Sequence, residues 1–586
     1  MGRRSVLLAA LSLALLVLAL SFREEPSPDS YFHLAVGRRI VEELRLPRVN
    51  EFLAFHQDFA FVDHEWLFQI GAWLLYAVGG ASLLGVAKGL VVLGAFAALF
   101  LALRPAGPVS ALVALLPAIL VAESRFVLRP EVVSLLGTAA TLAILERDRL
   151  EPRRAHIIIL GVLQVVWANC HGFALMGPGV TLAYLIGQTV LRALGPRAER
   201  AGLETTNVRP GRFGLLLGVQ LGASFLNPWF HEGALYPVLV LLRAGKDWKS
   251  GGLYMRIVEL QSPFGASVSG VFEVVVLKLA IGAAVVGFVL SLTEKKARLE
   301  HLVAAIILVG SASSYIRNLP FAAVGLALPI AHGLAALARR LGKSADVVRW
   351  LALASLSVTS LIMTRAALAD QLHGNSQYVA RAGLGFSDFL RYDDAVAFLE
   401  SSKPAGNIFN NFGAGHFLIF ARDRKAPLPY ICGNTELYPG KFLVEYHDIV
   451  NGRIPYGPLF AERNITDALL DHRVEVSREL IATFHADPEW RLVHADGHCV
   501  IYRKVDAKTP PAVDLARFAK EYKFTDTTRD EFTLTRALRA VGVLPKREPI
   551  PIEELHVACL LETLGRTDDA LALARRACEE RPDMPA

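Results

Sequence analysis

The sequence predicts an α-helical polytopic membrane protein with a soluble C-terminal part. Of its 586 residues, 53% are hydrophobic and only 20% are charged, whereas a soluble globular protein has about 45–50% apolar and about 25% charged residues. The mean hydropathy is +0.39. Up to about Ala369 the chain is a series of long apolar runs separated by short loops, and beyond that residue its composition is ordinary and polar.

Eleven apolar runs are candidate membrane spans, although several are shorter than the roughly 20 residues that cross a bilayer comfortably. They are residues 5–22, 82–103, 108–122, 132–145, 156–168, 174–194, 213–226, 268–292, 301–314, 319–337 and 350–366. The first run could be a signal peptide, but it is long for that role and lacks a clear A-x-A site. We therefore expect about 11 spans, with the N-terminus in the cytoplasm.

The distribution of basic residues orients the chain. The net charge is +6, and the basic residues form short clusters between apolar runs, which is typical of cytoplasmic loops and not of nucleic-acid binding. The segment 66–79 is short, and Gly79-Gly80 breaks it. If this segment lies in the outer interface and does not cross the membrane, all the larger basic clusters fall on the cytoplasmic side. These clusters are in loops 146–155, 195–212, 293–300 and 338–349. The C-terminal part is then extracytoplasmic, which in a bacterium means the periplasmic side of the inner membrane.

The first outer loop, residues 23–81, is predicted to hold two interfacial helices. Residues 31–44 have apolar side chains at helical spacing with charged residues opposite, as expected for a helix that lies flat in the interface. Residues 66–76 contain two Trp and a Tyr, which suit the depth of the lipid headgroups. Other polar motifs collect on the same outer side and suggest a hydrated cavity, although each could instead be a helix cap or a snorkelling helix end. They are residues 123–131, 169–172, 227–232, 246–264 and 315–318.

Several of these motifs resemble a known superfamily. The segments D-S-Y-F-H-L-A-V-G-R-R-I, L-P-R-V-N-E-F, W-L-F-Q-I-G-A-W-L-L-Y-A-V-G-G and S-R-F-V-L-R-P-E look like those of the GT-C integral-membrane glycosyltransferases, such as protein mannosyltransferases and aminoarabinose transferases. The motifs D-H-E-W-L-F-Q, W-A-N-C-H-G and L-N-P are more similar to a largely uncharacterised bacterial group of GT-C-like proteins with soluble tails. The resemblance covers residues 1–370. It implies transfer of a sugar from a polyprenyl-phosphate carrier in the membrane to an acceptor on the outer side.

The resemblance also implies roles for individual residues. Asp29 matches the acidic residue that opens the first outer loop, and it is expected to act as general base or to position the acceptor. The chemistry also needs cations to hold the phosphate leaving group, and by topology alone, not by the resemblance, Arg125, Arg129 and Arg317 are placed for this. Glu131 stands in place of the family's usual second aspartate, which leaves its role open.

The remaining polar residues of the first loop have two interpretations each. His33 could share the helical face of Asp29 and contact substrate, or it could be an ordinary interfacial histidine. Asp63, His64 and Glu65 could contact substrate or a divalent cation. Three adjacent residues cannot all face one ion from a regular helix, so no metal or cofactor is predicted, and Asp63 is expected to be the N-cap of the helix from Trp66.

Asn169 and His171 end a predicted span at the outer surface. Substrate contact and helix termination fit these two residues equally well, so both are kept as candidate substrate-binding residues.

Residues 385–505 are predicted to form a soluble α/β domain. We expect helices over 393–400, 413–420, 465–470 and 478–484, strands over 407–412 and 428–432, and a hairpin over 490–503 that turns at Asp496-Gly497. The glycine-rich stretch 410–416 is interpreted as a structural turn. Because no nucleotide-binding or nucleophile signature occurs here, this domain is expected to bind or position a protein partner.

The tail, residues 506–586, is expected to be helical with one tetratricopeptide-like unit, indicated by Gly565, Ala570, Ala577 and Pro582. A single repeat cannot bury a core, so it should form a helical hairpin that packs on a neighbour. The five cysteines lack C-x-x-C spacing, which argues against a zinc or redox motif and favours free thiols.

Two alternatives to an enzyme remain open at this point. A non-catalytic membrane scaffold would use the C-terminal domain to recruit partners. A transporter of a lipid-linked substrate is less favoured, because the membrane region shows no internal repeat. In addition, Glu273 and Lys278, which lie in one span, are five residues apart and do not share a helical face.

Overall fold

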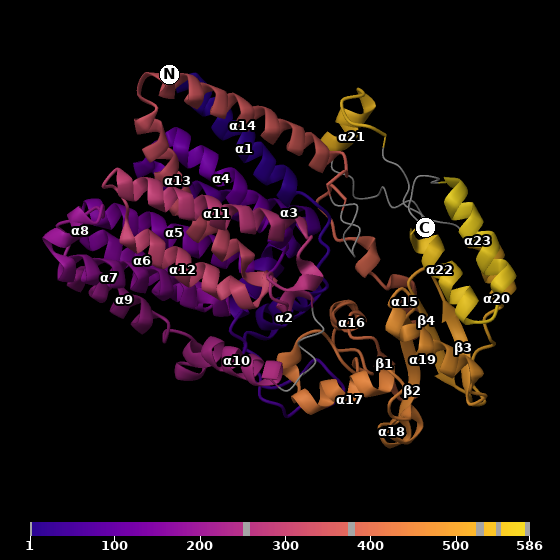
Figure 1. Ribbon diagram of the computed structural model, residues 1–586. Coiled ribbons are helices and arrows are strands. Elements are labelled where there is room, and N and C mark those ends of the chain that lie inside the picture. The colour runs from indigo at the N-terminus through magenta and orange to yellow at the C-terminus, as the bar shows by residue number, and fades with distance from the viewer. Residues whose placement is uncertain (1–2, 250–257, 373–380, 523–532, 547–551, 581–586) are drawn as a thin grey trace. The chain divides into compact units, whose positions relative to one another are not determined.

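The computed structural model describes residues 3–249, 258–372, 381–522, 533–546 and 552–580, and its chain divides into two compact units (Figure 1). Unit 1 comprises Met1–Arg23, His64–Phe68 and Val78–His373, and unit 2 comprises Glu24–Asp63, Gln69–Ala77 and Gly374–Ala586. Most of the first outer loop therefore belongs to the same unit as the C-terminal residues, a grouping that the sequence did not reveal.

Unit 1 is a bundle of helices (Figure 1). The helices are α1 (Arg3–Ser21), α3 (Trp66–Leu103), α4 (Pro108–Ala122), α5 (Glu131–Leu150), α6 (Arg154–Ala168), α7 (Met176–Leu194), α8 (Pro196–Arg200), α9 (Pro210–Ala223), α10 (His231–Lys249), α11 (Phe272–Thr293), α12 (Leu299–Ser314), α13 (Leu319–Arg340) and α14 (Ala345–Leu368). Helix α13 runs through the core, and every residue from Leu319 to Ala331 is buried. Part of α3, residues Gln69–Ala77, belongs to unit 2.

Each of the predicted apolar runs contains a helix. Among the described residues, seven helices are long and apolar enough to cross a membrane: α1, α3, α4, α7, α11, α13 and α14. Helices α6 and α12 are apolar but shorter. The chain is thus a multi-pass membrane protein, and the count of 11 spans stays a prediction.

The glycine pair divides α3 as predicted. Gly79 and Gly80 have non-helical dihedral angles, and Gly80 has φ of 63° and ψ of −161°, a combination that is essentially restricted to glycine. The helix that starts at Trp66 therefore ends at this pair, and a second helix continues to Leu103.

A buried charged network joins helices of unit 1 at the predicted cytoplasmic side. The Glu146 carboxylate of α5 accepts a hydrogen bond from the Tyr184 hydroxyl of α7 at 2.7 Å and lies 2.8 Å from His301 Nε2 of α12. Arg298, one residue before α12, forms an ion pair with the same carboxylate. Charges buried among apolar helices are stable only when they are paired in this way.

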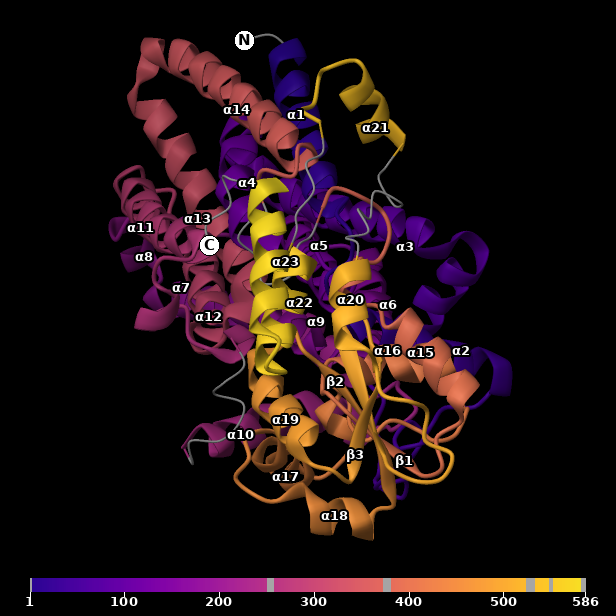
Figure 2. The same cartoon turned by 90° about the vertical axis from the view of Figure 1, so that its right-hand side faces the viewer.

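Unit 2 contains a mixed sheet, part of which Figure 2 shows. Its four strands lie in the order β1-β2-β4-β3. Strands β1 and β2 are parallel, and the other pairs are antiparallel. The elements are α2 (Asp29–Glu43), α15 (Asp393–Ser402), β1 (Asn407–Asn410), α16 (Ala414–Arg422), α17 (Gly440–Val450), α18 (Tyr456–Glu462), β2 (Ile465–Asp471), α19 (Glu475–Ala486), β3 (Trp490–Ala495), β4 (Cys499–Lys504), α20 (Leu515–Glu521), α21 (Thr533–Ala540), α22 (Ile552–Thr563) and α23 (Thr567–Glu580).

Two predicted elements of this domain are wrong. Residues 465–470, predicted as a helix, are central strand β2, which is buried almost throughout. Its apolar residues Ile465, Ala468 and Leu469 have the i, i+3, i+4 spacing of a helix, and the polar Asp467 is buried beside Arg503, so the sequence lacks the alternation of a strand. Residues 428–432, predicted as a strand, form only an isolated bridge between Pro429 and Ile408. The helices over 393–400, 413–420 and 478–484 and the 490–503 hairpin are confirmed.

Helix α2 packs on α16 within unit 2. The Tyr31 ring lies 4.7 Å from that of Phe386 and 5.1 Å from that of Phe417. Arg38 donates a hydrogen bond to the Phe420 carbonyl at 2.9 Å. The other side of α2 meets the first residues of α3 closely at Gly37, where a β-carbon would lie only 2.1 Å from the Gln69 carbonyl oxygen.

The C-terminal helices α22 and α23 lie beside each other and beside α20 (Figure 1). They share a small core of Val557, Ala558, Leu561, Ala570 and Leu573. A helical hairpin is therefore present, whereas its relation to tetratricopeptide repeats stays a prediction and Pro582 lies outside the described residues. All five cysteines are free thiols, as expected.

The contact at Gly37 makes the packing of α2 sensitive to one methyl group. We expect Gly37→Ala to destabilise the protein by about 1–3 kcal/mol, because backbone atoms of Gln69 cannot move aside. Thermal unfolding of the detergent-purified protein measures the change. Gly71→Ala is the matched control, since a β-carbon there meets nothing within 4 Å. Equal melting temperatures for the two variants would contradict the prediction.

Candidate functional site

Asp29 is the first residue of α2, and it faces a buried histidine. Its Oδ1 lies 3.2 Å from Nδ1 of His416, which is in the first turn of α16. The Asp29 side chain is 33% exposed, whereas that of His416 is 2% exposed. One carboxylate thus combines a buried partner with access to solvent, which is the arrangement that a catalytic carboxylate requires.

The segment before α16 positions His416. Asn410 accepts a hydrogen bond from the Tyr430 amide at 2.8 Å and donates one to the Ile431 carbonyl at 2.9 Å. Asn411 donates to Ser477 Oγ at 2.8 Å. This glycine-rich turn is therefore structural, as predicted, but it also delivers His416, which the sequence reading did not select. A histidine directly after a glycine-rich turn that follows a strand was the available signal.

The electrostatic setting of His416 favours the imidazolium. Burial lowers the pKa of His416, but the neighbouring Cys432 and Asp29 raise it, to about 9. At neutral pH a positive charge on the imidazole therefore compensates the charge of the Asp29 carboxylate.

The other two predicted residues of unit 2 are buried. His33 is 6% exposed. It lies four residues after Asp29 on α2, and this spacing places the two residues on the same helical face. Asp63 is 2% exposed, and its Oδ1 accepts a hydrogen bond from Gln69 Nε2 at 3.1 Å. The prediction of Asp63 as N-cap is wrong. Glu65 occupies the N-cap position and makes no side-chain cap hydrogen bond, and Asp63 accepts its hydrogen bond from the Gln69 side chain instead.

In unit 1, the predicted arginines form one cluster with two carboxylates. Arg125 donates to Glu131 Oε2 through Nε at 3.0 Å, and Arg317 donates to Glu131 Oε1 at 2.7 Å. Glu131 is buried at the N-terminus of α5, where the helix dipole also stabilises a negative charge. Both carboxylate oxygens of Glu131 accept hydrogen bonds from arginines. Glu131 therefore acts as a structural counter-ion.

The second carboxylate of the cluster, Glu259, is more exposed. Its oxygens lie 3.0 Å from Arg125 and 3.0 Å from Arg129, and its side chain is 39% exposed against 6% for Glu131. Burial raises the pKa of Glu259, but Arg129 and Arg125 more than offset this and hold the pKa below its ordinary value. Among the described residues, three guanidinium groups therefore lie beside these two carboxylates.

His64, Glu65 and His171 also meet within unit 1. The Glu65 carboxylate lies 3.6 Å from His64 Nε2 and 3.8 Å from His171 Nε2. His171 Nδ1 is 2.7 Å from Ser134 Oγ, and the His64 ring stacks on Tyr236 with centroids 4.8 Å apart. The group could bind a polar ligand, with imidazole and carboxylate atoms from two separate segments of the chain.

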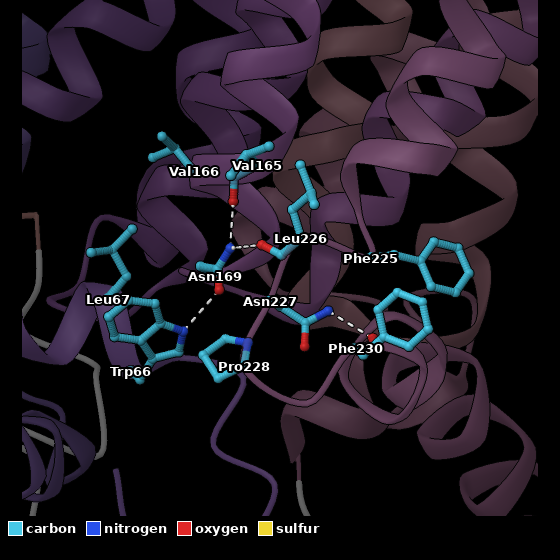
Figure 3. A pocket seen from close by; sticks show the side chains of 10 residues that line it. All are labelled: Trp66, Leu67, Val165, Val166, Asn169, Phe225, Leu226, Asn227, Pro228 and Phe230. Atoms are coloured by element: carbon cyan, nitrogen blue, oxygen red, sulfur yellow. Dashed lines mark hydrogen bonds between the residues drawn. The ribbon is translucent and has the colours of Figure 1, made fainter. Parts of the chain in front are cut away.

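Asn169 anchors two segments of unit 1 to each other. Its Oδ1 accepts a hydrogen bond from Trp66 Nε1 at 2.8 Å, and its Nδ2 donates to the carbonyls of Val165 and Leu226 (Figure 3). It lines a mainly apolar cavity of about 580 Å³. Since these protein contacts occupy its side-chain amide, the geometry favours the helix-termination interpretation of Asn169 over substrate contact.

Comparison with known proteins identifies the fold. No protein-family model matches the sequence, and no curated protein matches it. The structure is similar to that of the archaeal oligosaccharyltransferase AglB from Archaeoglobus fulgidus, in complex with an inhibitory peptide and a dolichol-phosphate, with a TM-score of 0.52 and 11% identity over 86% of this chain and 74% of that one. The apo form of the Archaeoglobus fulgidus oligosaccharyltransferase gives a TM-score of 0.56 and 12% identity over 87% and 75%.

ArnT from Cupriavidus metallidurans, bound to undecaprenyl phosphate, gives a TM-score of 0.47 and 12% identity over 86% of this chain and 99% of that one. The similarity to AglB shows the fold alone at this level of identity. The GT-C fold that the motifs predicted is thereby confirmed.

The raised pKa of His416 predicts a pH-dependent stability. Because the folded value of about 9 exceeds the ordinary 6.5, the contribution of His416 is complete below about pH 6.5 and is lost as the pH rises to about 9. We expect wild type to exceed His416→Gln by about 1–3 kcal/mol at pH 6 and to approach it above pH 9. Thermal unfolding across this range tests the prediction, and a difference that does not change with pH would contradict it.

The role of Glu131 as counter-ion is tested by removing its charge. Glu131→Gln leaves Arg125 and Arg317 without their shared carboxylate, and we expect a loss of about 3–5 kcal/mol in stability, typical of a broken buried ion pair. Thermal unfolding of the purified variant measures it. Glu232→Gln, at an exposed position, should leave the melting temperature unchanged. A stable Glu131→Gln protein would show that the cluster does not depend on this residue.

Proposed function

We propose that this protein is a membrane glycosyltransferase, which transfers a sugar from a polyprenyl-phosphate carrier to an acceptor on the outer face of the membrane. The observation that carries the proposal is Asp29. In a chain with a GT-C fold, the carboxylate that opens the first outer loop is partly exposed and is paired with buried His416. A structural carboxylate at a helix start has no need of a buried cation of this kind.

In the proposed reaction, Asp29 acts on the acceptor. It takes the proton of the attacking hydroxyl or amine as that atom forms a bond to the anomeric carbon of the sugar. The bond between this carbon and the phosphate oxygen breaks, and the electron pair stays with the lipid phosphate. His416 holds the carboxylate in place and balances its charge before the proton arrives.

The arginine cluster is proposed to bind the phosphate that leaves. The planar guanidinium group of arginine can donate two parallel, charge-assisted hydrogen bonds to a phosphate, which makes arginine well suited to binding it. Glu131 is buried and would stay, whereas Glu259 is the more exposed carboxylate and lies against Arg125 and Arg129. A phosphate that displaces Glu259 would meet two arginines already oriented toward an anion.

The solved structures agree with this class of donor. AglB was solved with a dolichol-phosphate and an inhibitory peptide, which supports a lipid-phosphate donor for a chain of the same fold. We further infer that the chain crosses the bacterial inner membrane 11 times, with the N-terminus in the cytoplasm and the C-terminal part outside. The basic loops support this orientation through the positive-inside rule.

The proposal predicts that Asp29→Asn abolishes glycosyl transfer without unfolding the protein. Removing a general base lowers a rate by about 10²–10⁴-fold. The variant is expressed at wild-type level in a deletion strain, and envelope glycans and lipid-linked sugars are compared by mass spectrometry. Asp58→Asn is the matched control, because Asp58 is an exposed aspartate of the same loop.

The alternatives give different results in the same experiment. If Asp29→Asn fully complements the deletion strain, so that its glycans match those of wild type, the catalytic assignment is overturned and a scaffold is favoured. Accumulation of the lipid-linked sugar in the Asp29→Asn strain, with the glycan product absent, is expected of a transferase whose donor reaches the site. A transporter would instead be impaired by neutralising Glu273 or Lys278, which lie within span α11.

A further inference from the structure

Three side chains of types that commonly bind transition metals lie close together at the tip of the β3–β4 hairpin. His494 is the penultimate residue of β3, Asp496 is in the turn and Cys499 starts β4. His494 Nε2 lies 2.8 Å from Asp496 Oδ2, and Cys499 Sγ lies 3.7 Å from the same oxygen. All three ligand atoms lie within 4.8 Å of one another, and no other group of this kind is found among the described residues.

Neighbouring groups hold two of these side chains in the required orientation. Asp496 Oδ1 accepts hydrogen bonds from the amides of His498 at 2.8 Å and Cys499 at 2.7 Å, so that Oδ2 is left to face His494 and Cys499. The His494 ring stacks on Phe398 with centroids 5.2 Å apart. Such surrounding contacts commonly orient the ligands of a metal.

We propose that His494 Nε2, Asp496 Oδ2 and Cys499 Sγ form a binding site for Zn²⁺ or a similar first-row transition-metal ion. A thiol and an imidazole exclude Mg²⁺ and Ca²⁺, which prefer oxygen ligands. Three protein ligands leave a fourth tetrahedral position for water or another ligand.

For two of the three pairs of ligand atoms, the geometry requires only a small adjustment. With metal–ligand distances of 2.0–2.3 Å, tetrahedral ligand atoms are about 3.3–3.6 Å apart. The observed separation of 3.7 Å between sulfur and oxygen is close to this, and the 2.8 Å separation between His494 and Asp496 would have to increase by about half an ångström. His494 and Asp496 are partly exposed, which gives an ion access to the site.

A bound ion would fix the turn that carries His498. That residue lies between the ligands in sequence and connects the hairpin to two distant segments of unit 2, because its Nδ1 is 2.7 Å from the Arg391 carbonyl and its Nε2 is 3.1 Å from Glu553 in α22. The metal would therefore hold the hairpin, and through His498 the C-terminal helices, in one arrangement.

Cobalt titration of the reduced, full-length protein in detergent tests the proposal. We expect one Co²⁺ per chain, with the visible bands of a tetrahedral ion and a near-ultraviolet thiolate charge-transfer band, and displacement by Zn²⁺. Asp496→Asn keeps the acceptor for both turn amides but removes the anionic ligand, so cobalt affinity should fall at least about tenfold. Cys499→Ser should remove the charge-transfer band.

Control variants separate this site from accidental binding. Cys578→Ser and His485→Gln change an exposed cysteine and an exposed histidine of the same unit, and both should bind cobalt as wild type does. The proposal is overturned if wild type shows no thiolate band, if the band persists in Cys499→Ser, or if Asp496→Asn binds with wild-type affinity. If a variant does not fold, the thiolate charge-transfer band and the cobalt stoichiometry of the wild-type protein still test the proposal. The titration involves no sugar donor, so its result is independent of the proposed glycosyl transfer.

Discussion

The packing of α2 on α16 is the contact on which the candidate chemistry of unit 2 depends. Tyr31 inserts between Phe386 and Phe417, and Asp29 meets His416 at one end of this contact. Residues almost 400 positions apart in the sequence thus form one small site. The C-terminal part is therefore not a separate appendage, because it supplies the buried His416 that faces the predicted catalytic carboxylate and the aromatic side chains against which Tyr31 packs.

In unit 1, ion pairs stabilise the charged residues that are buried within a bundle of apolar helices. Helix α5 carries a buried glutamate near each end, Glu131 at its start and Glu146 in its last turns, and each is paired with arginine. Because an unpaired charge costs several kcal/mol in such surroundings, these pairs restrict how neighbouring helices can be placed. The phosphate site proposed at one end uses the same pairing, with the difference that one of its carboxylates is partly open to solvent.

The sequence predicted what depends on local pattern. Hydropathy located the helices of unit 1, and the glycine pair located the break in α3. Strand β2 was mistaken for a helix because its apolar residues happen to have helical spacing, while its buried Asp467 removes the alternation expected of a strand. His416 was missed for another reason. Its place after a glycine-rich turn was a weak signal, and the contact with Asp29 that makes it important joins residues too distant in the chain for a single sequence to reveal. For the same reason Asn169 was taken as a candidate ligand, although its partners are the Trp66 indole and two carbonyls.

A fold shared at 11–12% identity does not by itself distinguish an enzyme from a scaffold that has kept the architecture and lost the chemistry. The distinction rests on polar groups that packing alone does not require, and the pair of Asp29 and His416 is the example here. Below about pH 9 the charged His416 stabilises the fold through its partner Asp29, but an apolar pair of the same size would hold α2 on α16 at least as well. A scaffold would have no reason to retain His416, whereas a transferase that must hold an ionised carboxylate at the membrane surface would.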